Sequence, residues 1–249
     1  MSGHSKWKTI KIKKGAADAK RGKTFTMHAK LIAMAARAGG DPSMNPNLRT
    51  AIDRAKEDNV PNMNIDRAVK KGTGEDKDGA IFEEVTYEAV GPAGSAFLID
   101  TITDNKNRSL SNVRSIVTRH GGSLASVGSV SWRFEKKAYL LVNPKGKGTD
   151  EVELTLIDSG AEDFSVCDEK YEVYASPEKL SDVKKNILGA GYLVEKDEVI
   201  WKPKDELKIE DLETAKKIIG LMESLDEDDD VSKVSANVTI DDNLLAQLG

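Results

Sequence analysis

Positively charged side chains are concentrated at the start of this sequence. The stretch from Gly3 to Lys23 contains seven lysines, one arginine and a single acidic residue, Asp18. Such cations bind phosphate groups and release the counterions around a polyanion, which gives affinity without sequence preference. An indole ring in the same stretch can stack on a base or pack against the protein. The candidate contact residues are Lys6, Trp7, Lys8, Lys11, Lys13, Lys14, Lys20, Arg21 and Lys23.

The charge of the 249-residue chain is unevenly distributed. Residues 1–75 contain 16 Lys and Arg against 7 Asp and Glu, whereas residues 76–249 contain 21 against 35. A basic first part on an acidic protein indicates that one part contacts a polyanion while the rest has another role. The alternative is a solvated basic face that balances an acidic body. The first 23 positions hold eight of the 16 cations, which favours the polyanion contact.

Enzymatic and metal-binding motifs are not evident. Gly22–Thr24 resembles the end of a phosphate-binding loop, but that loop needs a glycine where this chain has Ala17. The histidines, His4, His28 and His120, are far apart and lack the spacing of metal ligands. No GxSxG nucleophile motif is present. We therefore expect no enzymatic activity, no metal, no cofactor and no small-molecule substrate.

The sequence also indicates the cellular compartment of the protein. Cys167 is the only cysteine, so no disulfide can form within the chain. No apolar run approaches the roughly 18 residues that a membrane-spanning helix needs, and the basic start is not followed by the apolar stretch of a secretory signal. These features predict a cytoplasmic protein without a membrane partner. The acidic run Asp226–Asp230 lacks the spacing of a calcium loop, and we expect a solvated turn there.

A second candidate anion site lies in the middle of the chain. Asn105, Lys106, Asn107 and Arg108 fall where a predicted strand meets a predicted helix. Amide and basic side chains at a helix N-terminus can bind an anion. Capping and turn formation explain the asparagines without any ligand, so both interpretations stay open.

The first 75 residues are predicted to form short helices with narrow apolar stripes. Asn45 followed by Pro46 is typical of a helix start, and Asn62 is a second candidate cap. Gly72 is expected to end the third helix. We place a basic helical domain at residues 1–80.

The remaining sequence predicts two mixed domains. Alternating apolar residues predict strands up to Val130–Phe134, with Trp132 facing inward. Residues 138–201 have the order strand, helix, strand, strand, helix, strand, which is the ferredoxin-like arrangement. A further helix and strand in residues 205–241 would complete the sheet begun in residues 81–134; the alternative is a C-terminal appendix.

The predicted fold is therefore α+β and multidomain. An N-terminal helical bundle is followed by two α/β-sandwich (ferredoxin-like) domains, one inserted in the other. The predicted boundaries are 1–80 for the helical domain, 81–134 plus 205–241 for the discontinuous domain, 135–204 for the inserted domain and 242–249 for a tail.

Several motifs resemble one known family. The stretches "GHSKWKTIKIKKGAADAKRGKTFT", "GGDPSMNPNLRTAIDRAK" and "TDNKNRS" are similar, in this order, to motifs of the YebC/PmpR family. The resemblance implies three domains, no cofactor and no catalytic residue. Lys13 and Lys14 occupy the basic position where family members more commonly have arginine followed by lysine, and lysine lacks the bidentate fork of a guanidinium group.

The resemblance implies a regulator, but it leaves open which process the protein regulates. Family members are usually described as probable transcriptional regulators that bind DNA, and mitochondrial relatives as translational activators. Bacterial relatives are also assigned to the ribosome, where they relieve stalls at proline-rich stretches. We expect a non-enzymatic nucleic-acid-binding regulator of gene expression, with DNA or ribosomal RNA as its partner. A protein-binding scaffold is the alternative from another class.

Overall fold

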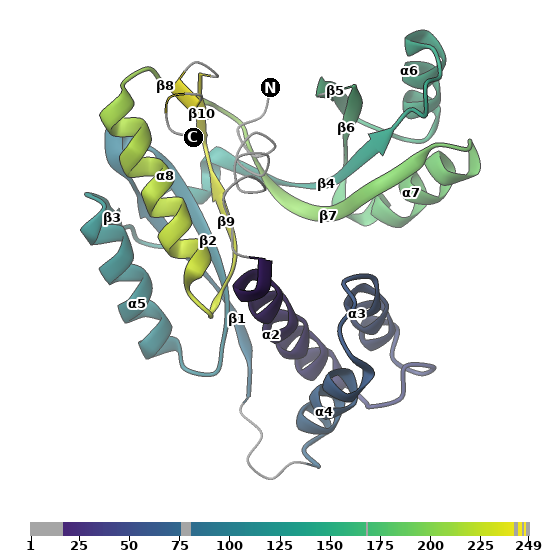
Figure 1. Cartoon of the computed structure of the whole chain (residues 1–249), viewed down its shortest axis with the longest axis horizontal. Coiled ribbons are helices and arrows are strands. Elements are labelled where there is room, and N and C mark those ends of the chain that lie inside the picture. The colour runs from purple at the N-terminus through teal and green to yellow at the C-terminus, as the bar shows by residue number, and fades with distance from the viewer. Residues whose placement is uncertain (1–16, 76–80, 168, 242–243, 246, 248–249) are drawn as a thin grey trace.

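The N-terminal part of the protein is a bundle of helices (Figure 1). The computed structural model describes residues 17–75, 81–167, 169–241, 244–245 and 247, with side chains from residue 21 onward. The helices are α2 (Ala17–Ala36), α3 (Pro46–Glu57) and α4 (Asn62–Thr73). Their shared core contains Ile32, Leu48, Ala55, Ile65 and Ala68. Because α2 begins at Ala17, the last part of the basic segment is helical.

Of the two helix N-caps predicted from the sequence for this bundle, the structure contains one. Asn45 is the N-cap of α3, and its side chain accepts a hydrogen bond from the Leu48 backbone N–H at 3.1 Å. This cap was expected. Asn62 is instead the first residue of α4, and no side chain caps that helix. The prediction that Asn62 is a cap is therefore wrong, because Pro61 occupies the cap position.

Gly72 does not end α4 as expected. The helix continues to Thr73, and Gly74 at φ 78° takes the left-handed conformation that ends it. Gly72 lies where α4 crosses α2. A Cβ atom at Gly72 would lie 2.3 Å from the Ala33 carbonyl oxygen and 2.6 Å from the Ala36 Cβ atom. The glycine therefore allows the close approach of the two helices.

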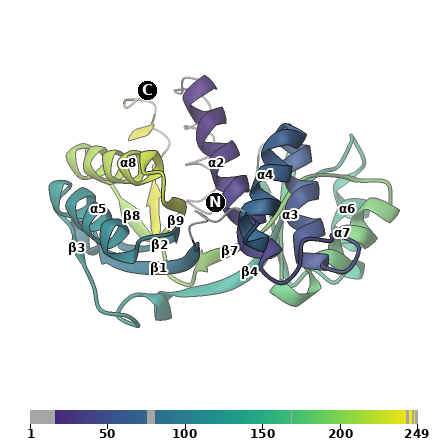
Figure 2. The same ribbon diagram turned by 90° about the horizontal axis from the view of Figure 1, so that it is seen from below.

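The first sheet has two helices on one face (Figure 2). Its strands pair antiparallel in the order β3-β1-β2-β9. The strands are β1 (Glu83–Val90), β2 (Ala96–Thr103), β3 (Ser123–Leu124) and β9 (Val231–Ala236), and the helices are α5 (Lys106–Arg119) and α8 (Leu212–Glu227). The pairing of β9 with β2 is what the discontinuous domain requires. The domain boundaries themselves stay a prediction. Two short strands, β8 (Leu207–Ile209) and β10 (Val238–Ile240), pair in parallel beside it.

The second sheet has the predicted ferredoxin-like order. Its elements are β4 (Phe134–Asn143), α6 (Thr149–Asp158), β5 (Asp163–Cys167), β6 (Lys170–Ala175), α7 (Leu180–Gly189) and β7 (Leu193–Pro203). The strands pair antiparallel in the order β5-β6-β4-β7. The first sheet differs, because its two central strands, β1 and β2, are consecutive and form a hairpin. The fold is thus α+β, with helices followed by two antiparallel sheets.

The two sheets meet where β4 begins and β7 ends (Figure 1). Leu98 of β2, on the sheet face opposite the helices, packs with Val130, Phe134 and the half-buried Trp201 in a small apolar cluster. This cluster holds the second sheet against the first.

The predicted strand through Trp132 is not formed. Ser131–Arg133 is one 3₁₀ turn, and Trp132 is 67% exposed. The reason lies on β1, where the buried carboxylate of Glu88 binds this loop. It accepts hydrogen bonds from the backbone N–H groups of Gly128, Val130 and Ser131. Backbone groups bound in this way cannot also join a strand ladder.

Candidate nucleic-acid interface

Most of the predicted basic strip lies outside the described residues. Those positions are Lys6, Trp7, Lys8, Lys11, Lys13 and Lys14. Lys20 is part of α2, but its side chain also lies outside the description. Arg21 is exposed on the first turns of α2, and Lys23 is half-buried. The predicted role of the strip in nucleic-acid binding stays a prediction.

Lys23 contacts the end of α8. Its ammonium group donates hydrogen bonds to the backbone carbonyl oxygens of Asp226 and, at 2.7 Å, Asp228. The last carbonyl groups of a helix have no partner within the helix and carry its negative dipole end. Burial lowers the pKa of Lys23, although the nearby acidic residues Asp228 and Asp229 raise it in part. The described contacts of Lys23 therefore link the helical bundle to the first sheet.

A second lysine of α2 makes a more deeply buried link. Lys30 donates hydrogen bonds to Asp230 Oδ1 at 2.8 Å, to the Ile102 carbonyl oxygen at 2.9 Å and to the Asp229 carbonyl oxygen at 2.7 Å. These three bonds use all the protons of the ammonium group. The lysine and aspartate side chains are 9% and 6% exposed. Sequence reasoning missed Lys30, whose only signal is a lone lysine among apolar residues of α2.

Asp230 connects three parts of the molecule. Its second carboxylate oxygen accepts hydrogen bonds from Arg108 at 2.8 Å and from Thr103 at 3.1 Å. Burial would raise the pKa of Asp230, but the hydrogen bonds from Lys30, Arg108 and Thr103 outweigh it, so the pKa is lowered. The expectation that Asp226–Asp230 is a solvated turn is wrong at Asp230, because a buried cation needs a carboxylate there.

Other cations of the helical bundle are exposed, apart from Lys71, which is half-buried. Seven of them form no ion pair with any carboxylate in the part of the chain that the structure describes: Arg21, Arg37, Arg49, Lys56, Arg67, Lys70 and Lys71. The second sheet differs, because many of its lysines pair with acidic residues. These are Lys137, Lys170, Lys184, Lys196 and Lys202. The unpaired cations leave the bundle surface available to an external polyanion.

The second candidate site is already rich in internal contacts. Asn105 is the N-cap of α5, and its side chain accepts from the Arg108 backbone N–H at 3.1 Å. Lys106 pairs with Glu83 at 2.6 Å, and Arg108 pairs with Asp104 at 2.8 Å as well as with Asp230. Asn107 is exposed. Capping thus accounts for Asn105, and an anion would have to compete with carboxylates for both cations.

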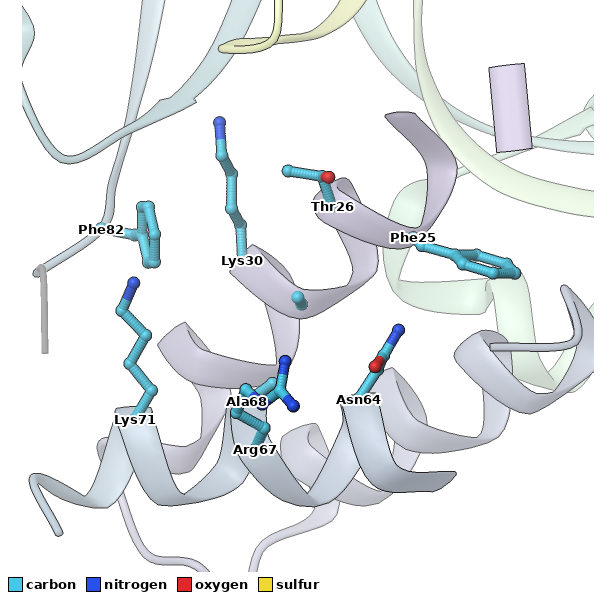
Figure 3. Close-up of a pocket in the computed structure, with 9 residues that line it drawn as sticks. Phe25, Thr26, Lys30, Asn64, Arg67, Ala68, Lys71 and Phe82 are labelled. Atoms are coloured by element: carbon cyan, nitrogen blue, oxygen red, sulfur yellow. The ribbon is translucent and has the colours of Figure 1, made fainter. Parts of the chain in front are cut away.

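A cavity of about 310 Å³ lies between α2, α4 and Phe82, the residue just before β1. In Figure 3, Asn64, Arg67 and Lys71 rise from α4 toward this space. The Lys71 ammonium group lies 4.8 Å from the centroid of the Phe82 ring, and that of Lys30 lies 5.9 Å from it. The cavity therefore combines an aromatic wall with cationic side chains.

The described histidines have structural partners. His28 lies 2.6 Å from an Asp58 carboxylate oxygen, and His120 lies between the Ile116 carbonyl oxygen at 2.9 Å and the Ser224 hydroxyl at 3.4 Å. Among the described residues, no three His, Cys, Asp or Glu side chains gather in a way that could hold a metal ion. None of the described helices has the length and apolarity needed to span a membrane.

Comparison with known proteins gives the same family for both parts of the chain. Residues 5–75 match the "TACO1/YebC protein N-terminal domain", and residues 82–238 match the "TACO1/YebC second and third domain". A probable transcriptional regulatory protein of Citrifermentans bemidjiense is 46% identical over 249 residues, with 100% of both chains covered. One of Thermoanaerobacter pseudethanolicus is 48% identical over 247 residues, covering 97% of this chain and 98% of the relative.

A solved structure supports the fold. The crystal structure of a conserved hypothetical protein from Aquifex aeolicus superposes with a TM-score of 0.81 and 44% identity, covering 91% of this chain and 93% of that one. The helical bundle, the two sheets and the relatives' sequences thus agree, and the chain belongs to the TACO1/YebC family.

Proposed function

We propose that this protein is a non-enzymatic regulator of gene expression that binds nucleic acid through its N-terminal helical domain. The observation that carries the proposal is the set of cations on or next to α2, α3 and α4 that form no ion pair with a described carboxylate. They continue the basic strip that begins at Lys6. Lysine and arginine that are not neutralised internally can replace the counterions of a nucleic acid.

The acidic remainder of the chain restricts the contact. Residues 76–249 carry 35 acidic against 21 basic side chains, so they repel a polyanion. Lys30 and Lys23 hold the basic bundle against this acidic body from the side of α2. A nucleic acid is therefore expected to bind the outward faces of the bundle.

DNA is the first candidate partner, because the relatives are named probable transcriptional regulatory proteins. The second candidate partner is ribosomal RNA, in which case the protein would be a ribosome-associated translation factor that relieves stalls at proline-rich stretches. The connection between α2 and α3, which runs from Arg37 to Asn45, favours this second candidate. A helix-turn-helix reader of the major groove has a much tighter turn. A surface that reads phosphates and shape suits structured RNA.

Affinity measurements on the full chain at several salt concentrations test the proposal. One variant replaces Lys6, Lys8, Lys11, Lys13 and Lys14 with glutamine. The matched control replaces five exposed lysines of the acidic body with glutamine: Lys145, Lys179, Lys185, Lys208 and Lys217. Both variants lose the same charge, so any difference reports the position of the contact.

We expect the strip variant to bind duplex DNA or ribosomal RNA more weakly and with a flatter salt dependence. Each lost phosphate contact lowers the slope of log affinity against log salt by roughly 0.9 on duplex DNA. The control should retain the wild-type slope. Equal losses in both variants, or a wild-type affinity independent of salt, would contradict the proposal. Retained affinity for a protein partner would then favour the scaffold.

A further inference from the structure

The cavity between α2 and α4 has the chemistry of a nucleotide site. Phe82 forms an aromatic wall, and Ala29 and Ala68 contribute small apolar side chains. Asn64 and Arg67 stand on the same side of α4, one helical turn apart, and both point toward the cavity in Figure 3. Polar groups thus border an otherwise apolar space.

The cations of the cavity differ in what they already bind. Lys30 lines it only with its stem, because its ammonium group is occupied by Asp230 and two carbonyl oxygens. Lys71 lies beneath the Phe82 ring, and Arg67 is exposed. Neither Arg67 nor Lys71 pairs with a carboxylate that the structure describes. The cavity therefore has two positive charges available to an anionic ligand.

Size and composition select the ligand. The cavity, at about 310 Å³, is at the lower end of the range of small-molecule sites. It is too small for a helix of paired bases. A small inorganic anion would leave the apolar wall without a partner, and a hydrocarbon would leave the cations without one. One unpaired nucleotide supplies both a planar base and a phosphate.

We propose that this cavity binds one unpaired nucleotide of a nucleic-acid strand, with the base at Phe82 and the phosphate at Arg67 and Lys71. The proposal rests on the proposed nucleic-acid-binding function and adds a site to it. Bases stack on aromatic side chains with little sequence preference. Asn64 can form hydrogen bonds with the edge of the base. Such a site binds single strands or looped-out bases, because bases within a duplex are not accessible.

The test compares two arginines of the bundle in the full chain. Arg67→Ala removes a cavity cation, and Arg49→Ala removes an exposed cation of α3 outside the cavity. The probes are a fluorescently labelled ten-nucleotide oligouridine, an oligodeoxythymidine of the same length and a DNA duplex of ten base pairs. Phe82→Leu is a third variant that retains apolar volume but removes the aromatic ring.

We expect Arg67→Ala to weaken binding of at least one single-stranded probe about tenfold, and Phe82→Leu to weaken it several-fold. Duplex affinity should fall no more in Arg67→Ala than in Arg49→Ala. The single-stranded probe that is more affected identifies RNA or DNA as the source of the nucleotide. Equal losses in Arg67→Ala and Arg49→Ala on every probe would overturn the nucleotide site and leave the proposed function intact. A wild-type protein that binds neither single-stranded probe would overturn the nucleotide site, and one that also fails to bind ribosomal RNA and duplex DNA would overturn the proposed function.

Discussion

The ammonium group of Lys30 lies 2.8 Å from Asp230 Oδ1, and both side chains are almost fully removed from solvent. The two residues are 200 positions apart in the sequence. Lys30 belongs to the helical bundle, and Asp230 lies just before the strand that completes the first sheet. This buried pair therefore fixes the basic bundle on the acidic body.

Replacement of Asp230 by asparagine should destabilise the protein strongly. It leaves Lys30 and the Thr103 hydroxyl buried without the carboxylate that they bind. Removal of one partner from a buried ion pair costs about 3–5 kcal/mol. Urea denaturation of Asp230→Asn should show a decrease in the free energy of unfolding within this range. Asp229→Asn is the control, because Asp229 is exposed and only its backbone oxygen binds Lys30. A loss equal to that of the control would show that the pair is unimportant for stability.

Gly72→Ala should destabilise the helical bundle although alanine favours helices by about 1 kcal/mol. The added methyl group would lie 2.3 Å from the Ala33 carbonyl oxygen and force α4 away from α2. Overpacking of this kind costs about 1–3 kcal/mol. Gly189→Ala, at the end of α7 with no atom within 4 Å of the added group, should be neutral or stabilising. Thermal unfolding of both variants gives the comparison, and a stabilised Gly72→Ala would contradict the close helix contact.

Glu88 should make stability depend on pH. Burial would raise the pKa of Glu88, but its hydrogen bonds to three backbone N–H groups outweigh this and hold the pKa below the ordinary 4.5. As the pH falls through that ordinary value, the unfolded chain takes up the proton first. The stabilisation by Glu88 is therefore complete above it and is lost toward the lower pKa of the folded state.

Glu88→Gln removes this contribution. At neutral pH the variant should be less stable than the wild type by about 2 kcal/mol, since it loses charged hydrogen bonds. The difference should shrink when unfolding is measured at about pH 3. Glu84→Gln, an exposed position on the same strand, is the control. If the free energies of unfolding of the wild type and Glu88→Gln differ by the same amount at both pH values, the pH-dependent stabilisation by Glu88 is contradicted.

Trp132 and Phe134 should respond very differently to truncation. Phe134 is 3% exposed between the two sheets, whereas Trp132 is 67% exposed and its indole N–H donates to the Ser129 carbonyl oxygen. Phe134→Ala should cost about 3–5 kcal/mol, and Trp132→Ala less than about 1 kcal/mol. Chemical denaturation provides both values. A large loss in Trp132→Ala would show that the indole ring packs in a core.

Much of the fold could be predicted from the sequence because most elements carry their own signal. Alternating residues such as Val234 and Ala236 indicate a strand whatever it pairs with. The Asn45 cap is equally local, because it depends only on the residues that follow it. The ferredoxin-like order of the second sheet follows from a simple succession of such elements.

Features that depend on distant partners could not be predicted. Trp132 continues the alternation of Val130 and Phe134, but Glu88 on another strand binds the backbone there and prevents a strand. Lys30 and Asp230 each resemble an ordinary solvated charge until the fold brings them together.

The candidate site also has one part that the sequence predicts and one part that only the folded structure reveals. The basic strip is visible in the sequence as a local excess of charge, but the described contacts of Lys23 are with the end of α8. The cavity at Phe82 exists only because two helices and the start of a strand converge. No short stretch of sequence contains this arrangement.

Photo-crosslinking of the full chain to nucleic acid in cells tests the central claim most directly. The measurement identifies both the crosslinked peptides and the attached nucleic acid. We predict that the crosslinks fall within residues 1–75 and at Phe82, which lines the cavity beside α2 and α4, and that the attached sequences are promoter DNA or ribosomal RNA. Crosslinks confined to residues 83–241 would contradict the claim that the helical domain is the nucleic-acid contact.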